Sequence, residues 1–493
     1  MVYCTGNEVT IMYNFCGREV FWDMFLADEN HGITIKNHTP VRKNIVLSLD
    51  APWEGEHGAY ISLVKVGDIY RLYYRGAGYN NGPEKVEGAY HSVFCVAESP
   101  DGKVFTKPNV GIYEYGGSKD NNIVFMLDKR IDNFSVYYDE NPDCPADERF
   151  KALSSCLPTG QCLGKLGYYK SADGYHFEYV RPLLLEGVFD SLNLIVWDSE
   201  RKKYRIYFRN FHAPDGSDIQ LGKHDDTSIR DVRYVESEDF NVWSEPLRVR
   251  YTDGKENIQY YTSGITKYYR ANTYFGVPVR YIDRASDAVN YKYLPKLSGF
   301  RERLIQREGR GGTAVTDCTA IFSRDGYMFE RSGEAFCTPG IENNENWIYG
   351  DCYFGRGLFE TESDYPFEPN EMSFYKCHGY RHRPVDVVRY TLRLDGFRSW
   401  HADKDGGYIL TKPISLCGDS MSVNFATSAL GSLRIIICDK DGTPIPGYDS
   451  TSLFGDSIER PVDFEKQISE LSGKEVRLMI KMTECDLYSI NVE

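Results

Sequence analysis

The sequence has no apolar run near the roughly 18 residues that a transmembrane helix needs, so we expect no membrane span. Its N-terminus lacks a basic start followed by an apolar core, which predicts no signal peptide and a cytoplasmic location, although a trimmed secreted chain would look the same. Basic residues are outnumbered, with 57 Lys and Arg against 72 Asp and Glu, and the net charge is −15. Because phosphates would be repelled, we expect neither a general nucleic-acid binder nor a protein of anionic membranes.

Metal-binding motifs are also missing. No Cys-x-x-Cys pair and no His-Glu-x-x-His motif occurs, so a structural zinc site is not expected. The 13 cysteines are odd in number and scattered, and Cys95, Cys156 and Cys438 lie inside apolar segments. This pattern favours reduced thiols in a cytosol over a disulfide framework. We predict no metal and no organic cofactor, while a bound Ca²⁺ stays open, and the sequence does not indicate the oligomeric state.

Aromatic residues are plentiful, at 14% of the 493 residues with 38 tyrosines, and such a composition favours β-structure. Four turns of the form Ser-x-Asp, namely Ser-Pro-Asp-Gly, Ser-Ala-Asp-Gly, Ser-Glu-Asp-Phe and Ser-Arg-Asp-Gly, are each followed closely by an aromatic residue. Their aspartates are Asp101, Asp173, Asp239 and Asp325, which are spaced by 72, 66 and 86 residues. A repeat of this length, built from short strands, predicts a β-propeller.

The repeats predict an all-β chain with a five-bladed β-propeller over residues 41–384. Residues 346–377 lack the turn and would form the closing blade, completed by a strand from the N-terminal region. Residues 1–40 would be a strand or cap packed on the propeller. From residue 385 onward, strands with alternating faces are separated by turns such as Lys-Asp-Gly, which predicts a C-terminal β-sandwich over residues 385–493.

Acidic residues stand near the start of successive predicted blades. Glu56, Asp120, Asp190 and Glu256 follow one another at intervals of 64, 70 and 66 residues, and Glu54 stands beside the first of them. Since the first strand of each blade lines the propeller axis, these carboxylates would meet in one central funnel. Like charges held close leave one acid protonated beside an ionised one, as glycosidic bond cleavage requires. The alternative is that these acids only cap turns.

Residues 189–210 and 53–76 carry a resemblance. An acid opens a β-strand at Asp190, and a second strand follows over residues 202–210; residues 59–76 repeat this strand pair after Glu54 and Glu56. Both segments resemble the five-bladed propeller glycoside hydrolases of families 32, 43 and 68 and their relatives, and the propeller-then-sandwich order resembles them too. The chain has glutamate where their blade-one acid is usually aspartate, and it lacks the Asn-Asp-Pro-Asn, Arg-Asp-Pro and Glu-Cys signatures of family 32, so it would be a distant member.

The resemblance implies three catalytic roles. Glu54, or else Glu56, would be the base, Asp190 the acid that tunes pKa and orientation, and Glu256 the proton donor. Other acids that the funnel could recruit are Asp120, Glu236, Glu360 and Glu371.

Arginines recur near the ends of predicted strands, at Arg75, Arg209, Arg280 and Arg356, and Arg230 adds another. Arginine binds carboxylate or sulfate through two nitrogens, so these residues could hold an anionic glycan. Alternatively, each pairs with a neighbouring acid and positions it. Further candidates for substrate contact, each of which could equally be an ordinary turn or sheet residue, are Trp53, His57, Asn122, Asn193 and Trp347.

The sequence therefore predicts a glycoside hydrolase that cleaves a furanoside or a terminal pyranoside, with an oligo- or polysaccharide as its partner. Three alternatives stay open: a non-catalytic carbohydrate-binding propeller, a propeller phosphorylase or sugar deacetylase, and an interaction scaffold. The sugar, the linkage and the stereochemistry of cleavage do not follow from the sequence.

Overall fold

The structure is a computed structural model, and it describes residues 13–78, 91–127, 131, 133–159, 164–184, 186–220, 223–294, 302, 305–306, 310–380 and 384–493. Almost all regular structure in these residues is β-strand. Short helical segments are η1 (Ala146–Glu148), η2 (Ala285–Lys292), α2 (Arg310–Thr313) and η3 (Ile468–Leu471).

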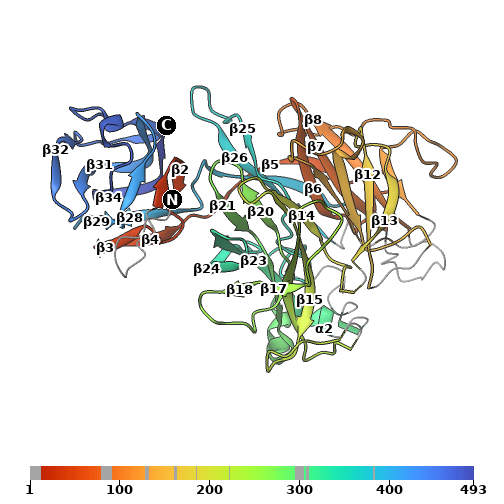
Figure 1. The fold of residues 1–493 in the computed structure, drawn as a ribbon. Coiled ribbons are helices and arrows are strands. Elements are labelled where there is room, and N and C mark those ends of the chain that lie inside the picture. The colour runs from red at the N-terminus through yellow and green to blue at the C-terminus, as the bar shows by residue number, and fades with distance from the viewer. Residues whose placement is uncertain are drawn as a thin grey trace.

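Four sheets of four strands are arranged like the blades of a propeller (Figure 1). The first contains β6 (Ala59–Val66), β7 (Ile69–Gly78), β8 (His91–Ser99) and β9 (Ile123–Met126). The second contains β10 (Phe134–Tyr138), β11 (Phe150–Ser154), β12 (Leu166–Ser171) and β13 (Glu178–Leu184). The third contains β14 (Leu194–Asp198), β15 (Lys203–His212), β16 (Ile229–Ser237) and β17 (Leu247–Arg248). The fourth contains β25 (Phe359–Thr361), β26 (Glu371–His378), β27 (Asp386–Arg393) and β5 (Val41–Ser48).

A seven-stranded sheet lies between the third and fourth of these sheets in the chain. It contains β18 (Arg250–Tyr251), β19 (Tyr260–Thr262), β20 (Ile265–Tyr268), β21 (Thr273–Gly276), β22 (Val279–Asp283), β23 (Ala314–Ser323) and β24 (Met328–Cys337). In this sheet β19 pairs with β22 and β20 pairs with β21, and both β21 and β22 pair with β23.

The recurring Ser-x-Asp turn joins neighbouring sheets. The turn glycines Gly102, Gly174 and Gly326 have positive φ angles between 71° and 80°, and each offers its carbonyl to a tyrosine hydroxyl of the preceding sheet. Tyr73 donates to Gly174 at 2.9 Å; the corresponding bonds run from Tyr375 to Gly102 at 2.6 Å and from Tyr207 to Gly326 at 2.7 Å. A β-carbon at Gly174 would lie 2.6 Å from the Tyr73 hydroxyl, so glycine is required for conformation and for space.

The remaining strands form one eleven-stranded sheet that unites both ends of the chain. From the N-terminal side come β1 (Tyr13–Phe15), β2 (Gly17–Val20), β3 (Ala27–His31) and β4 (Ile33–Asn37). From the C-terminal side come β28 (Arg398–Ala402), β29 (Gly407–Thr411), β30 (Ile414–Leu416), β31 (Met421–Asp439), β32 (Pro444–Asp449), β33 (Asp456–Pro461) and β34 (Val476–Val492).

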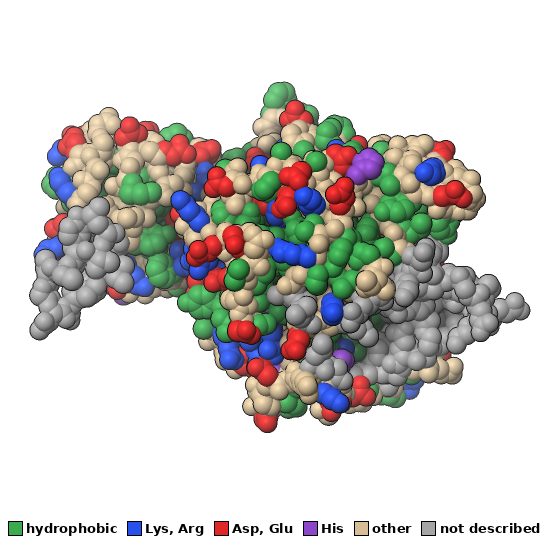
Figure 2. All heavy atoms as spheres, turned by 45° about the vertical axis from the view of Figure 1, so that its right-hand side comes forward, with side chains coloured by type: hydrophobic (Ala, Val, Ile, Leu, Met, Phe, Trp, Pro, Cys, Tyr) green, Lys and Arg blue, Asp and Glu red, His purple; other side chains and the backbone are tan. Residues whose placement is uncertain are grey.

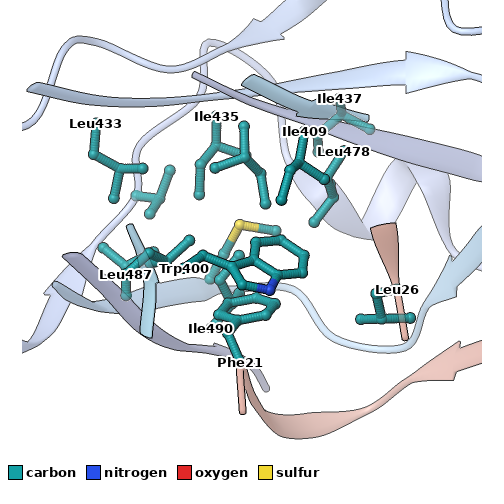
Figure 3. Close-up of a cluster of buried hydrophobic side chains, with 14 of the residues drawn as sticks. Phe21, Leu26, Trp400, Ile409, Leu433, Ile435, Ile437, Leu478, Leu487 and Ile490 are labelled. Atoms are coloured by element: carbon teal, nitrogen blue, oxygen red, sulfur yellow. The ribbon is translucent and has the colours of Figure 1, made fainter. Parts of the chain in front are cut away.

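The core of this eleven-stranded sheet is built around Trp400 (Figure 3). The indole stacks on Phe21 with ring centres 4.0 Å apart, and its N–H donates to the carbonyl of Asp23 at 2.9 Å. Trp400 is fully buried, so it is a core residue and has no face open to a sugar. Because Phe21 comes from the N-terminal segment, this core needs both ends of the chain.

The strand pairing bears on two predicted boundaries. Residues 1–40 were expected to pack on the propeller, and β1–β4 pair with C-terminal strands. The same segment also contacts the seven-stranded sheet, where Val20 and Trp22 join a shared cluster and Arg324 bonds Glu19 and Asp23. The predicted start of a separate domain at residue 385 falls just before β27, which is an interior strand of the fourth four-stranded sheet, between β26 and β5. Alternation of apolar residues is the same in both kinds of sheet, so it cannot locate this boundary. The expected closing strand from the N-terminal region is β5.

The expectation of reduced thiols is corrected. Cys16 and Cys417 form a disulfide that ties the segment after β1 to the segment after β30. Cys156 is disulfide-bonded as well, whereas Cys95 and Cys438 are free and buried. In the described residues no helix is long and apolar enough to cross a membrane. On the face drawn in Figure 2, the described acidic and basic side chains are interspersed.

Candidate functional site

Arginine and tyrosine side chains from several sheets gather where the inner strands begin. At the start of β6, Ala59 pairs with Arg75 of β7. At the start of β19, Tyr260 pairs with Arg280 of β22. We call this group the arginine–tyrosine cluster, and it consists of His57, Tyr60, Arg75, Asp190, Arg209, Arg230, Tyr261, Tyr281, Tyr349, Tyr353 and Tyr380.

Asp190 and Arg209 form the centre of the cluster. A guanidinium nitrogen of Arg209 donates to a carboxylate oxygen of Asp190, and the guanidinium carbon lies 4.7 Å from the ring centre of Tyr261. The Asp190 side chain keeps 32% of its surface exposed, whereas that of Arg209 keeps 5%. Burial by itself would raise the pKa of Asp190, but the charges of Arg209 and Arg230 outweigh it and hold that pKa below its usual value. Asp190 is therefore an ionised carboxylate that a ligand can reach.

Arg230 is a second cation of the cluster, and its surroundings differ from those of Arg209. Its guanidinium carbon lies 4.1 Å from the ring centre of Tyr281, and one nitrogen donates to the amide oxygen of Gln259 at 2.8 Å. Among the described residues no carboxylate pairs with Arg230. Burial and the nearby charge of Arg209 lower its pKa, which is the direction expected for a cation without a counter-ion.

Arg75 and its neighbours bring blade one into the cluster. Arg75 donates to the backbone carbonyl of His57 at 3.1 and 3.2 Å and lies 4.7 Å from the ring centre of Tyr60. The imidazole of His57 packs against Tyr380, with ring centres 5.1 Å apart. Tyr60 has a φ angle of 55° at a register shift between Ala59 and Ser62, and its hydroxyl lies 3.4 Å from the backbone carbonyl of Asp190. Such bulges commonly redirect a side chain beside an active site.

Arg280 lies at the same strand position but is neutralised. It donates to both carboxylate oxygens of Asp317, at 2.7 and 2.6 Å. Two of the predicted arginines, Arg209 and Arg280, thus pair with acids, and Arg230 does not. Arg356, also expected in a second strand, instead lies in the segment before β25, where its backbone forms a bridge with Ser62 of β6.

Glu54 belongs to a buried network, not to the cluster. It is fully buried and accepts hydrogen bonds from the Tyr74 hydroxyl at 2.6 Å, from Lys107 at 2.7 Å and from the backbone of Ala51 at 2.8 Å. Asn122 donates to the same Tyr74 hydroxyl at 2.7 Å.

Trp53 extends this network, since its indole N–H donates to the side chain of Asn122 at 2.9 Å. Glu54, Trp53 and Asn122 therefore hold the loop before β6 in place. Glu56, two residues further, is partly exposed and directly precedes the cluster residue His57.

The other predicted acids lie apart from Asp190 in their described contacts. Glu256 lies 3.8 Å from Arg250, and Asp120 is exposed on a loop where it accepts a bond from Asn109. Glu236 pairs with Arg205 at 2.7 Å and Glu371 with Lys43 at 3.1 Å, while Glu360 accepts a hydrogen bond from Asn370 at 2.9 Å.

Asn193 and Trp347 make local contacts. The amide of Asn193 is fully buried and donates to the carbonyls of Phe189 and Ser191, both at 2.9 Å, so it shapes the turn that presents Asp190. The indole of Trp347 donates to the carbonyl of Gly340 at 2.9 Å.

Tyr281, Tyr353 and Tyr380 are cluster residues that the sequence pattern did not reveal. With 38 tyrosines in the chain, most of them in sheets, no single tyrosine stands out. The one signal for Tyr281 is its position directly after Arg280 in a β-strand.

The described residues contain no group of three His, Cys, Asp or Glu side chains arranged to hold a metal ion. The donor set of the cluster fits this finding, because it holds cations and phenols rather than several carboxylates.

No protein-family profile matches the sequence, and no curated protein matches it. Several solved structures are similar in fold at low sequence identity. One is an N-acetylgalactosamine deacetylase from F. plautii in complex with blood group B trisaccharide, with 11% identity over 74% of this chain and 96% of that one, at a TM-score of 0.43. A second is described by the words "The GH130 family of mannoside phosphorylases contains glycoside hydrolases that target beta-1,2 mannosidic linkages in Candida mannan". It has 12% sequence identity over 72% of this chain and 94% of that one, at a TM-score of 0.43. A third is a glycosyl hydrolase from Bacteroides ovatus, with 12% sequence identity over 77% of this chain and 94% of that one, at a TM-score of 0.39.

Proposed function

We propose that the protein is a carbohydrate-processing enzyme that cleaves a glycosidic bond in a sugar carrying a negative charge. The observation that carries this proposal is the contrast between Arg209, which is paired with Asp190, and Arg230, which has no carboxylate among the described residues. Arg230 is partly buried, and a partly desolvated cation without a counter-ion is costly unless a ligand supplies the charge. A carboxylate or sulfate on the sugar would do so through two parallel hydrogen bonds.

The tyrosines would form the walls of the sugar site. Tyr261, Tyr349 and Tyr353 lie with ring centres 5.3 to 6.4 Å apart and approach one another edge to face. Aromatic rings pack on the apolar faces of sugars and offer a phenol for the hydroxyls at the rim. Such a lining supports a pyranose or furanose ring above Asp190.

Asp190 would act in its ionised form, since its pKa is held low. An ionised carboxylate stabilises the positive charge that develops on the sugar, or attacks it, or activates water. The proton donor would be Glu56 rather than Glu54. Glu54 is hydrogen-bonded to Tyr74 and Lys107 away from the cluster, whereas Glu56 directly precedes the cluster residue His57. Glu256 is not required in this scheme.

In this proposal the architecture is that of a five-bladed propeller with the seven-stranded sheet as its fourth blade and β25, β26, β27 and β5 as its closing blade. The tyrosine-to-glycine bonds support a closed ring, because Tyr375 of the last sheet bonds Gly102 of the first. The eleven-stranded sheet would fold on itself as a sandwich around the Trp400 core.

Phosphorolysis is the second candidate, and Arg230 is the observation that favours it. Inorganic phosphate could take the place of water as the attacking group and pair with Arg230, close to Arg209. The two reactions differ in one requirement, because only phosphorolysis depends on phosphate.

The test is sugar release from matched neutral and uronate-containing oligosaccharides, each with and without phosphate. We expect Asp190→Asn to lower turnover by about 100-fold or more, in the range usual for a lost catalytic carboxylate. Arg230→Gln should raise KM for the charged substrate or for phosphate by about tenfold, which is about 1.4 kcal/mol. Arg434→Gln is the matched control, since its pair with Asp449 lies on the eleven-stranded sheet.

The outcomes separate the alternatives. Turnover that appears only with phosphate identifies a phosphorylase, and turnover without it identifies a hydrolase. Full activity of Asp190→Asn would place the chemistry elsewhere. Sugar binding without any turnover in the unmodified protein would leave a binding module.

A further inference from the structure

A second polar cavity lies at the other end of the inner strands. It has a volume of about 1050 Å³ and is lined by the last residues of β6, β10, β14 and β20 and by residues of β1 and β2. On β6 the arginine–tyrosine cluster is at Ala59, whereas Leu63, Val64 and Lys65 line the cavity. The cavity is therefore distinct from the site at Asp190.

Three buried side chains of this cavity have hydrogen-bonding groups without partners. They are Nε of Arg356, the hydroxyl of Tyr137 and Nε1 of Trp197, and no residue in the described ranges bonds any of them. Arg356, Tyr137 and Trp197 are only 9%, 3% and 8% exposed, so bulk water does not readily satisfy them. Buried polar groups are nearly always bonded to something, which makes three such groups in one cavity informative.

The three groups lie close together. The guanidinium carbon of Arg356 is 4.4 Å from the ring centre of Tyr137, and one of its nitrogens donates to the carbonyl of Ile195 at 3.0 Å. Trp197 lies two residues after Ile195 on β14, and Tyr137, Ile195 and Trp197 pack in one buried cluster. Arg356, Tyr137 and Trp197 thus come from three separate segments that line one cavity.

The charge of Arg356 is not neutralised by a neighbouring carboxylate. No ion pair involves it within the described residues, and burial lowers its pKa. The acid that influences it is Glu140, and burial raises the pKa of Glu140, so that this acid is a weaker counter-ion.

Most other cations of the cavity are already paired. Arg270 is bound to Asp395 at 2.9 Å, Lys267 to Asp198 at 2.8 Å and Arg324 to Asp23 at 2.7 Å. Arg356 is therefore the deeply buried cavity cation that still lacks an anion.

We propose that Arg356, Tyr137 and Trp197 form a binding site for a small oxyanion, a carboxylate or a phosphate group, separate from the site at Asp190. The guanidinium supplies charge and an N–H, and the indole N–H and the phenol O–H donate to further oxygens of the same group. Neutral sugars offer oxygen acceptors as well, but they leave the charge of Arg356 uncompensated. This proposal does not depend on the function proposed for the arginine–tyrosine cluster.

Trp197 provides a direct readout, because it is part of the proposed site. Inorganic phosphate and glucuronate would each be titrated into the full-length protein while tryptophan fluorescence and heat are recorded. We expect a saturable fluorescence change that is absent in Trp197→Phe, and affinity at least tenfold weaker in Arg356→Gln. Which of the two anions binds more tightly distinguishes a phosphate from a carboxylate ligand.

Two further variants separate this site from the one at Asp190. Arg230→Gln should leave the Trp197 signal unchanged, while Tyr137→Phe, a milder change for the fold than Arg356→Gln, should weaken binding several-fold. Fluorescence that does not respond to either anion, or binding that is lost in Arg230→Gln and kept in Tyr137→Phe and Arg356→Gln, would overturn the proposal and leave water as the occupant of the cavity.

Discussion

Arg209 binds the carboxylate of Asp190 while its guanidinium lies 4.7 Å from the ring centre of Tyr261. The arginine therefore does two things: it lowers the pKa of Asp190, and it joins the acid to the tyrosine wall. Asp190, Arg209 and Tyr261 make this arrangement, and removing the charge of Arg209 tests it.

Replacing Arg209 with glutamine should raise the pKa of Asp190, since burial then acts with less opposition. If ionised Asp190 is needed, activity is lost as pH falls through its pKa, so the acidic limb of the kcat/KM profile should move to higher pH by about one unit or more. The measurement is kcat/KM between pH 4 and 8 for the parent and the variant. An acidic limb that stays in place would show that Asp190 does not control it.

Glu54→Gln should affect stability far more than catalysis. The side chain is fully buried between Lys107 and Tyr74, and the substitution leaves Lys107 with only Asp50 as its acidic partner. Losing one member of a buried charge pair costs about 3 kcal/mol or more. We expect a lower urea midpoint with turnover per folded molecule within about threefold of the parent, whereas Glu56→Gln should lower turnover strongly. Equal loss of turnover in both variants would contradict the assignment to Glu56.

These assignments show which parts of the site could be predicted from the sequence. The Ser-x-Asp turn located the sheets because its glycine carbonyl accepts a bond from a tyrosine of the neighbouring sheet, so its spacing follows the ring itself. Asp190 could be singled out because it lies in the turn just before β14, and Arg209 because it lies in β15, which pairs with β14. Glu54 and Glu56 could not be told apart, because nothing in the local sequence says which of two nearby acids turns inward.

The pairing of the two chain ends could not be predicted for a similar reason. Strands β1–β4 and β28–β34 are separated by the whole propeller, and alternating apolar residues do not specify a partner. The same holds for Cys16 and Cys417, which are 401 residues apart and carry no spacing motif.

The Cys16–Cys417 disulfide should stabilise the eleven-stranded sheet. Cross-links that close long loops restrict the unfolded chain and contribute about 2–4 kcal/mol. The double variant Cys16→Ser/Cys417→Ser should therefore unfold at a lower temperature, as should the parent protein after reduction. The control is a double variant that replaces Cys95 and Cys438, which are free and buried. This variant keeps the disulfide, so its melting temperature should still fall when the protein is reduced. Identical melting of the parent with and without reductant would argue against the bond.

Stability should fall in mild acid because of two half-buried histidines. Burial lowers the pKa of His38 to about 4 and that of His378, which also lies near Lys376, to about 3. In the unfolded chain these histidines bind protons near pH 6.5, whereas in the folded protein they stay neutral to a lower pH. Acid therefore favours the unfolded chain, so that the free energy of unfolding is highest above pH 6.5 and decreases as pH falls toward 4. We expect the urea midpoint to drop between pH 6.5 and 4.5, and less steeply in His378→Gln. A midpoint independent of pH in this window would contradict the prediction.

Cys337 should be the most reactive free thiol of the described residues. It is the one free cysteine there that is not fully buried, and the ammonium of Lys376 lies 3.5 Å from its sulfur and 3.6 Å from that of Cys352. Hydrogen bonds from Cys318 and Cys352, together with Lys376, lower the pKa of the Cys337 thiol, whereas burial raises the pKa values of Cys318 and Cys352. We therefore expect Cys337 to lose its proton before Cys318 and Cys352.

Because the thiolate is the reactive form, iodoacetamide should modify Cys337 at pH 6, where an ordinary cysteine with a pKa near 8.5 reacts slowly. Mass spectrometry of the digested protein after timed labelling between pH 5 and 9 measures this for each cysteine. Lys376→Met removes the stabilising charge and should slow labelling of Cys337 at pH 6 by about tenfold while changing it little at pH 9. If Cys337 instead reacts with the pH dependence of an ordinary thiol, and Lys376→Met has no effect, the ammonium does not stabilise a thiolate there.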